Sequence, residues 1–415
     1  MFRLKTAVEV CSRPEIELLL CCARRDVDAA IAGRIRDLVM KPIDWEYLLR
    51  TAFAHGVMPL LYKNLNEVCP DAVPGAVRDK TRETFQAHVQ RNLFLTAELL
   101  KLVQEFADHG IAALPYKGPV LAASVYGDIS LRSFTDLDIL VDKGDVLRAK
   151  DLILSRGYRL SKPLTNRQEA ARLRSRNEKD LAFVDLDDFV KVELHWEVAS
   201  LALFPFETKA LWERLEEIDI GGTRVFNLPP EDLLLTLCVH GAKHFFARLE
   251  WICDIAELLA ANPRIRWDAV IEQATRLRTR RMLFLGLVLA RDLLGSDLPA
   301  EVLQGIQADR ETGLLGSKVQ AALFSEMDSS STVFKRDAYV IALREGWRDR
   351  TWLRVYYLAD YLVALVKPNA ADRGAVQIPS VLSFLYYLLR PMRLIKVYGV
   401  TAWAYVLRQV KHRVS

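Results

Sequence analysis

Hydrophobic and polar residues follow different periods in successive parts of the chain. In the first quarter, apolar residues recur every three or four positions with charges between them, which is typical of amphipathic helices. This spacing predicts helices within 14–38 and over 75–108. Asp44 is a predicted N-cap for a further helix that ends at Gly56. We therefore expect an N-terminal helical region over residues 1–108.

Short strands and short helices alternate in residues 109–228. One strand is predicted from Ile111 to Gly118, where a helix begins. Another strand is predicted around 136–141, and two more are joined by a turn at 187–188. We expect an α+β protein in which a small mixed-sheet core is flanked by N-terminal and C-terminal helical regions.

Helical spacing returns from Pro229 and predicts a C-terminal helical domain over 229–415. Its end is unusual, because Arg373 to Ser415 contains seven Lys or Arg and no acidic residue. A basic, apolar tail of this kind suits a helix that docks on the rest of the protein, which we prefer. It also leaves open a peripheral contact with an anionic membrane surface.

Composition narrows the class of protein. The 415 residues carry 57 Lys and Arg against 53 Asp and Glu, a net charge of +4, and 51% are hydrophobic. These values exclude a disordered chain and a small disulfide scaffold, and they give no basic field for coating DNA. The six cysteines lack metal or disulfide spacing, and no signal peptide or spanning segment is visible. We expect a cytoplasmic protein.

Two predicted strands carry carboxylates on one face. Asp136 and Asp138 are two residues apart, so their side chains project to the same side of their strand. On a later strand, Lys191, Glu193 and His195 share a face in the same way. If the strands are neighbours, the three acids converge, and a hard divalent cation such as Mg²⁺ or Mn²⁺ would hold them together. Such a site suits phosphoryl or nucleotidyl transfer.

The turn at Lys117-Gly118 fits the other half of such a site. Gly118 lets backbone approach a ligand, and the helix that follows offers free N–H groups to a phosphate. Lys117 and Arg132 supply cations for phosphate oxygens.

The order of these motifs resembles the nucleotidyltransferase superfold of DNA polymerase beta, and more narrowly a bacterial family of uncharacterised nucleotidyltransferases. The resemblance extends from about residue 42 to about 400. The residues that carry it are Lys117-Gly118, Tyr126, Arg132, Asp136, Asp138, Gly157-Tyr158, Glu193, His195 and Trp196.

The resemblance implies an Mg²⁺-dependent transfer of a nucleoside monophosphate from an NTP, with release of pyrophosphate. Asp136, Asp138 and Glu193 would be the catalytic, metal-binding residues. The acceptor would be a small molecule, a sugar or a peptide, and ATP is the expected nucleotide. Residues assigned to nucleotide binding are Lys117, Gly118, Arg132, Lys191 and His195.

Two other functions fit the same sequence. The chain could be a regulatory protein that binds nucleotides without turnover, or a toxin-like enzyme that adds nucleotides to tRNA. RNA is therefore a possible partner, whereas DNA is not expected.

His240, Lys243 and His244 lie on one face of a predicted helix. A metal site would need a further ligand, so we prefer a helix face that lines a substrate cleft. These three residues are weak candidates for substrate contact. The basic segment that precedes the Glu193 strand is interpreted as a solvated helix face, with an anionic substrate as the alternative. Its members are Arg167, Arg172, Arg174, Arg176 and Lys179.

Overall fold

A computed structural model describes most of the chain. It covers residues 13–175, 177–198, 209–324, 336–368, 384–390, 392 and 399. The chain divides into two compact units, Met1–Asp328 and Ser329–Ser415. The predicted boundaries at 108/109 and 228/229 both lie inside the first unit and stay predictions.

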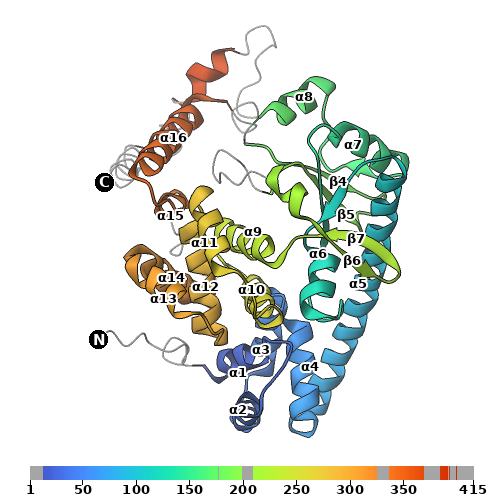
Figure 1. Cartoon of the computed structure of the whole chain (residues 1–415), viewed down its shortest axis with the longest axis vertical. Helices are drawn as coiled ribbons and strands as arrows, with labels where there is room; N and C mark the ends of the chain where they lie inside the picture. Colours follow the sequence, from blue (N-terminus) through green and yellow to red (C-terminus); the bar gives the residue numbers. More distant parts are fainter. Residues whose placement is uncertain are drawn as a thin grey trace. The chain divides into compact units, whose positions relative to one another are not determined.

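Helices form the N-terminal part of the first unit, as the apolar spacing predicts (Figure 1). They are α1 (Pro14–Cys22), α2 (Ala29–Val39), α3 (Trp45–Ala54), α4 (Met58–Val68) and α5 (Gly75–Asp108). The helical pattern within 14–38 thus corresponds to two helices. The carboxylate of Asp44 accepts a hydrogen bond from the Tyr47 N–H at 3.0 Å, so its predicted role as an N-cap is confirmed.

A mixed five-stranded sheet follows, in the order β1-β2-β5-β4-β3. The pairing of β2 with β5 is parallel, and the other three pairings are antiparallel. The strands are β1 (Ala113–Pro115), β2 (Asp136–Val141), β3 (Arg159–Leu160), β4 (Asp180–Val184) and β5 (Lys191–His195). The helices between them are α6 (Gly118–Leu121), which continues into the π-helical η3 (Ala122–Tyr126), α7 (Val146–Ser155) and α8 (Asn166–Arg174). The predicted α+β class is confirmed.

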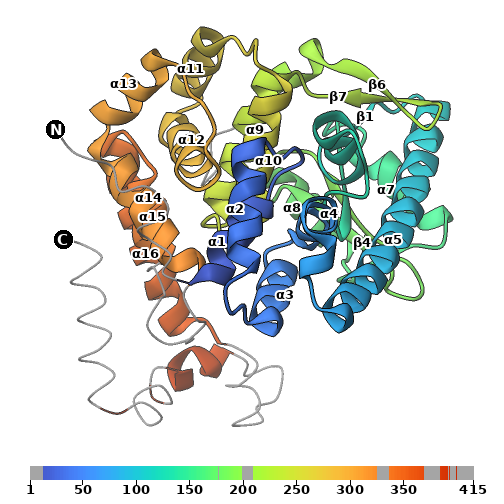
Figure 2. The same ribbon diagram turned by 90° about the horizontal axis from the view of Figure 1, so that it is seen from below.

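One face of this sheet packs into the hydrophobic core. Leu137 and Ile139 of β2 and Val192 of β5 are fully buried in a cluster with apolar residues of α5 and α7. Figures 1 and 2 show α5 running alongside the sheet on that side. Because side chains alternate along a strand, the polar residues between these apolar ones must face the opposite side.

A second, two-stranded sheet was not predicted from the sequence. Its strands are β6 (Glu216–Ile220) and β7 (Thr223–Asn227), joined by Gly221 and Gly222, both with positive φ. A Gly-Gly pair between two strands is a recognisable hairpin signal.

From Pro230 to residue 324, the described part of the first unit is helical, as expected. Its helices are α9 (Pro230–Lys243), α10 (Leu249–Ala261), α11 (Trp267–Arg276), α12 (Arg280–Leu294), α13 (Ala300–Ala308) and α14 (Arg310–Leu323). α10 contacts η3 of the core, and it also contacts α9 and α12. The five cysteines within the described residues are buried and free.

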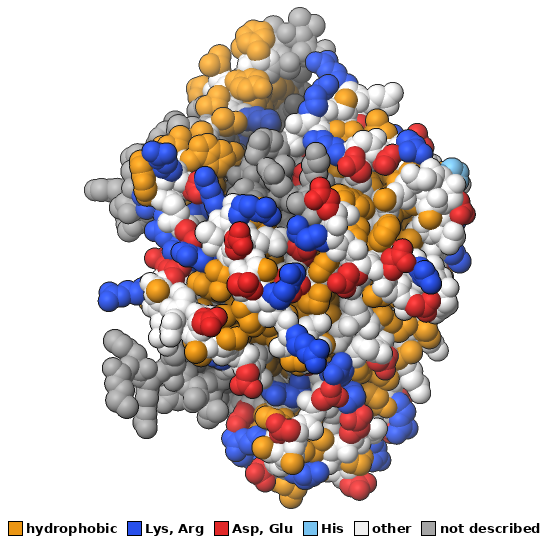
Figure 3. All heavy atoms as spheres, in the orientation of Figure 1, with side chains coloured by type: hydrophobic (Ala, Val, Ile, Leu, Met, Phe, Trp, Pro, Cys, Tyr) orange, Lys and Arg blue, Asp and Glu red, His pale blue; other side chains and the backbone are white. Residues whose placement is uncertain are grey.

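The second unit contains α15 (Arg336–Ala342) and α16 (Trp347–Val366). Several large apolar side chains here are exposed, among them Trp347, Trp352 and Val355. Figure 3 shows hydrophobic side chains gathered on the surface of this unit. Across the described ranges, no helix combines the length and the hydropathy needed to span a bilayer. Most of the basic tail considered above, including 400–415, falls outside the described residues.

Candidate active site

The parallel pairing of β2 with β5 places the predicted acids side by side. The register sets Asp138 opposite Glu193 and Asp136 opposite Lys191. These side chains lie on the face of the sheet away from the hydrophobic core, because their neighbours Leu137, Val192 and Leu194 are buried in it.

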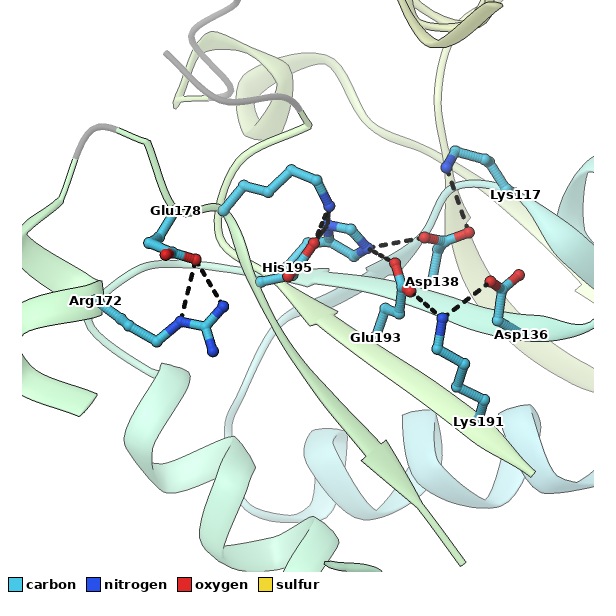
Figure 4. Close-up of polar contacts among 10 residues, drawn as sticks. Lys117, Asp136, Asp138, Arg172, Glu178, Lys191, Glu193 and His195 are labelled. Carbon is cyan, nitrogen blue, oxygen red and sulfur yellow. Dashed lines mark hydrogen bonds and ion pairs between the residues drawn. The ribbon is translucent and has the colours of Figure 1, made fainter. Parts of the chain in front are cut away.

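His195 connects two of these acids. Its Nε2 lies 2.8 Å from Oδ1 of Asp138 and 3.4 Å from Oε2 of Glu193 (Figure 4). The ligand atoms of the three residues all lie within 4.8 Å of one another, so they could hold a metal ion together. Asp136 lies one pleat away on β2, and its side chain is more open to solvent, at 34%.

Two lysines balance the negative charge. Lys117 approaches Oδ2 of Asp138 at 3.4 Å. Lys191 contacts the carboxylate of Glu193 and lies 3.7 Å from Oδ2 of Asp136. The carboxylates are therefore held close together by cations rather than left to repel one another.

These contacts shift the pKa values of the three carboxyl groups in different directions. Burial alone would raise the pKa of Asp138, but Lys117 and the hydrogen bond from His195 hold it well below its usual value. The hydrogen bond from His195 is also the main reason that the pKa of Glu193 is lowered to about 2. Burial raises the pKa of Asp136, and the charges of Asp138 and Glu193 add to this effect. Asp138 and Glu193 are thus anionic near neutral pH, as metal ligands must be.

The turn at Gly118 brings Lys117 to this cluster. Gly118 has φ +55°, a left-handed conformation that favours glycine, and it is the first residue of α6. A Cβ built there would lie 3.5 Å from the backbone oxygen of Asp136, so the turn also lies close against β2.

A pocket of about 380 Å³ opens in front of the carboxylates. This volume lies in the usual range for small-molecule sites. The pocket is lined by every candidate residue except Lys191, namely Lys117, Gly118, Arg132, Asp136, Asp138, Glu193, His195, His240, Lys243 and His244. The helical region after residue 229 therefore supplies one wall of the pocket, whereas substrate contact by His240, Lys243 and His244 stays a prediction.

Arg132 reaches the pocket but is strongly engaged elsewhere. Its Nε and Nη2 donate to the two carboxylate oxygens of Asp254, at 2.7 and 2.8 Å. The third nitrogen, Nη1, donates to the Ser133 carbonyl at 3.2 Å and is not paired with a carboxylate. Contact between Arg132 and the triphosphate stays a prediction.

The wall from α9 and α10 contains three neighbouring rings, those of His240, His244 and Trp251. The centroids of His240 and His244 are 4.8 Å apart, and each lies 5.4 Å from that of Trp251. Burial, and then the charge of Lys117, lowers the pKa of His240 well below its usual value. The ring planes are inclined to one another by 52°, 89° and 43°, so the cluster is angular rather than flat. One exposed ring face is enough to stack with a base or another planar group.

Sequence reasoning missed several ionisable residues of the pocket, among them Lys179, Asp180, Arg248 and Glu250. Lys179 was interpreted as part of a solvated helix face, and this is wrong: α8 ends at Arg174, and Lys179 lies beyond it with Nζ 3.3 Å from Nδ1 of His195. Burial, followed by the charge of Lys243, lowers the pKa of Lys179 to about 7. The position of Lys179 directly before a strand with alternating apolar residues was the sequence signal that could have placed it at the sheet.

Another missed residue is Glu250, which α10 places in the lining. Burial raises the pKa of its carboxyl to about 7. In the remainder of the basic segment, Arg167 and Arg174 are exposed on α8, as expected, and Arg172 is paired with Glu178 at 2.6 Å. Arg176 lies outside the described residues.

Comparison with known proteins agrees with this geometry. None of the curated proteins matches the sequence. A sequence model of the family described as "Uncharacterised nucleotidyltransferase" matches residues 41–295, a range that contains β1 to β7 and α9 to α12. The match ends before residue 400, to which the resemblance had been expected to extend. It covers more than half of the chain, and the chain therefore belongs to this family of nucleotidyltransferases.

Proposed function

We propose that the protein is a nucleotidyltransferase that depends on a divalent cation and transfers a nucleoside monophosphate from an NTP, with ATP as the first candidate. The acceptor would be a small molecule, a sugar or a peptide. The observation that carries the proposal is the β2–β5 register, which sets Asp138 beside Glu193 at the pocket. Membership of the family supports the same reaction class.

The donor set fits a divalent cation. Asp138 and Glu193 are anionic, and both contact His195. Asp136 offers a third carboxylate on the same face of the sheet. Carboxylate oxygens are suitable ligands for both Mg²⁺ and Mn²⁺. When bound, such a cation neutralises phosphate oxygens and keeps coordination positions open for water or substrate.

In the proposed reaction an acceptor oxygen bonds to the α-phosphorus while the bond to the α–β bridging oxygen breaks. Pyrophosphate leaves with that oxygen, and the acceptor proton passes to a carboxylate of the site. The protein contributes position and charge: Lys117 and the turn at Gly118 would receive the triphosphate. The rings of His240, His244 and Trp251 would receive the base or the acceptor.

Pyrophosphate release tests the proposal. The protein is incubated with Mg²⁺ or Mn²⁺, each NTP and a panel of sugar, peptide and small-molecule acceptors. We expect the Asp136→Ala/Asp138→Ala double variant to lose about 1,000-fold in rate, because cation ligands contribute several kcal/mol to such transition states. Asp151→Asn is the matched control, since its side chain is 73% exposed on α7. Activity that survives in the double variant would remove these aspartates from the mechanism.

Two further outcomes would redirect the proposal. NTP binding by calorimetry without product from any acceptor would indicate a regulatory protein. Extension of labelled tRNA in a parallel reaction would make tRNA the acceptor.

A further inference from the structure

His195 lies where a ligand of the cation would lie. Its side chain is only 1% exposed, and Nε2 is 2.8 Å from Asp138 Oδ1 and 3.4 Å from Glu193 Oε2. Ligands bound at about 2.1 Å are about 3.0 Å apart at right angles and about 3.4 Å apart in a tetrahedron. The two distances from Nε2 match those between neighbouring metal ligands, and all three ligand atoms lie within 4.8 Å of one another. A cation bound here would replace the proton that Nε2 donates to the acids.

The other ring nitrogen faces a carboxylate. Asp180 is the cross-strand partner of His195 in the β4–β5 pairing, and its Oδ2 lies 3.8 Å from Nδ1. When Nε2 of a histidine binds a metal, Nδ1 carries the ring proton and usually donates it to a carboxylate or carbonyl. A movement of about 0.8 Å would bring Asp180 to hydrogen-bond distance.

Two neighbours confine the ring. Lys179 Nζ lies 3.3 Å from Nδ1 and also contacts the carboxylate of Asp180. Because an ammonium only donates, Nδ1–H can reach Asp180 when this lysine turns from the ring and keeps its contact with the carboxylate. The ring of Tyr116 lies edge-on to the imidazole with centroids 5.6 Å apart, and it is fully buried. The imidazole is thus confined between β2 and β4 with Nε2 directed to the acids (Figure 4).

We propose that His195 supplies a nitrogen ligand to the cation site, that Asp180 orients its ring, and that the site consequently binds first-row transition ions more tightly than Mg²⁺. This proposal rests on the proposed function of the same site. An imidazole with two carboxylates departs from the all-oxygen set that Mg²⁺ prefers. Affinity for such a mixed site rises from Mn²⁺ to Co²⁺.

Metal binding to the full chain tests the selectivity without any turnover. Free Mn²⁺ is followed by electron paramagnetic resonance, and Mg²⁺ and Co²⁺ are titrated by calorimetry. We expect Mn²⁺ to bind at least about tenfold more tightly than Mg²⁺, and Co²⁺ more tightly still. His195→Gln should weaken Mn²⁺ and Co²⁺ binding by about 10- to 100-fold and Mg²⁺ binding by less than about threefold. Equal affinity of the wild type for all three ions would overturn the proposal.

A spectroscopic measurement identifies the ligand atom directly. Electron spin echo modulation from a coordinated imidazole ¹⁴N is expected in the Mn²⁺ complex of the wild type and should vanish in His195→Gln. His240→Gln is the matched control, because this buried imidazole lines the same pocket but lies outside the three-residue metal group. Modulation that is absent from the wild type, or that persists in His195→Gln, contradicts the proposal.

Asp180→Asn provides a second test of the proposal if circular dichroism shows that His195→Gln does not fold. We expect it to weaken Mn²⁺ binding by about tenfold while the nitrogen modulation remains. Unchanged Mn²⁺ affinity would exclude Asp180 as the orienting residue. Pyrophosphate release with Mn²⁺ but without nitrogen modulation would reject the role of His195 alone and leave the proposed function standing.

Discussion

Arg132 and Asp254 form a two-point ion pair that is almost completely buried. The two N–O distances are 2.7 and 2.8 Å, and the side chains are 8% and 1% exposed. Tyr126 adds a hydrogen bond of 2.9 Å to the same carboxylate. The pair joins the loop before β2 to α10, so it fixes the helical wall of the pocket relative to the strand that carries the aspartates.

We expect Asp254→Ala to lower the free energy of unfolding by about 3–5 kcal/mol, because it leaves the Arg132 guanidinium buried without its partner. Denaturation in urea measures the change. Asp188→Asn is the control: it removes one partner of the exposed pair with Arg159, whose side chains are 50% and 64% exposed. That change should cost less than about 1 kcal/mol. A loss below 1 kcal/mol for Asp254→Ala would show that the buried pair is not a structural link.

The stability of the fold should decrease as the solution is acidified, and His55 is one cause. Its Nδ1 accepts a hydrogen bond from the Leu249 N–H at 3.2 Å, and burial, with the charge of Arg248, lowers the pKa of His55 to about 4. The unfolded chain binds this proton near pH 6.5, so the stability present above pH 6.5 is lost as the pH falls towards 4.

His55→Asn tests this contribution, because asparagine can keep the acceptor but does not titrate. Between pH 6.5 and 4, the dependence of unfolding free energy on pH should be smaller in the variant by up to about 1.4 kcal/mol per pH unit. The difference between the two proteins at pH 7.5 gives the packing cost, which does not vary with pH. Parallel curves for wild type and variant from pH 7.5 to 4 would contradict the assignment.

Gly118→Ala should destabilise the protein by about 1–2 kcal/mol, because residue 118 has φ +55° and an L-residue is strained there. Nucleotide affinity, measured by calorimetry, should fall as well if the turn receives phosphate. Gly33→Ala is the control within helix α2, where a new Cβ meets no atom within 4 Å. It should stabilise the protein by about 0.5–1 kcal/mol. Changes of the same sign in both variants would be inconsistent with the proposed strain.

Gly241→Ala should disturb the turn between α9 and α10. A Cβ at this position would lie 2.2 Å from the buried ring of Phe246, and Phe246 itself has φ +46°. We expect a loss of about 1–3 kcal/mol from overpacking, together with weaker NTP binding, because the turn carries His244 and Arg248 into the pocket.

Gly313→Ala, in α14, is the control for this position, since no atom lies within 4 Å of its added Cβ. It should leave nucleotide affinity unchanged. Wild-type stability and nucleotide affinity in Gly241→Ala would show that the contact with Phe246 does not position the wall.

The local pattern of residues was sufficient for most elements. Helix α5 and strands β2 and β5 follow from periodicity, and the cap at Asp44 follows from residue type, because these features depend on neighbours a few positions away. The same alternation showed that Asp136 and Asp138 share one face of their strand, and that Glu193 and His195 share one face of theirs. The sequence therefore determined which side chains each strand offers to the site.

Only the tertiary structure decided how these side chains meet. The parallel register of β2 with β5 sets Asp138 against Glu193, and it results from burial of Leu137, Ile139 and Val192 against α5 and α7. The pairing of Arg132 with Asp254 and the approach of Lys179 to His195 join residues whose contact depends on how whole elements pack. These pairings depend on how whole elements pack, and that packing is determined by many apolar contacts between residues far apart in the sequence. A short stretch of sequence therefore cannot predict them.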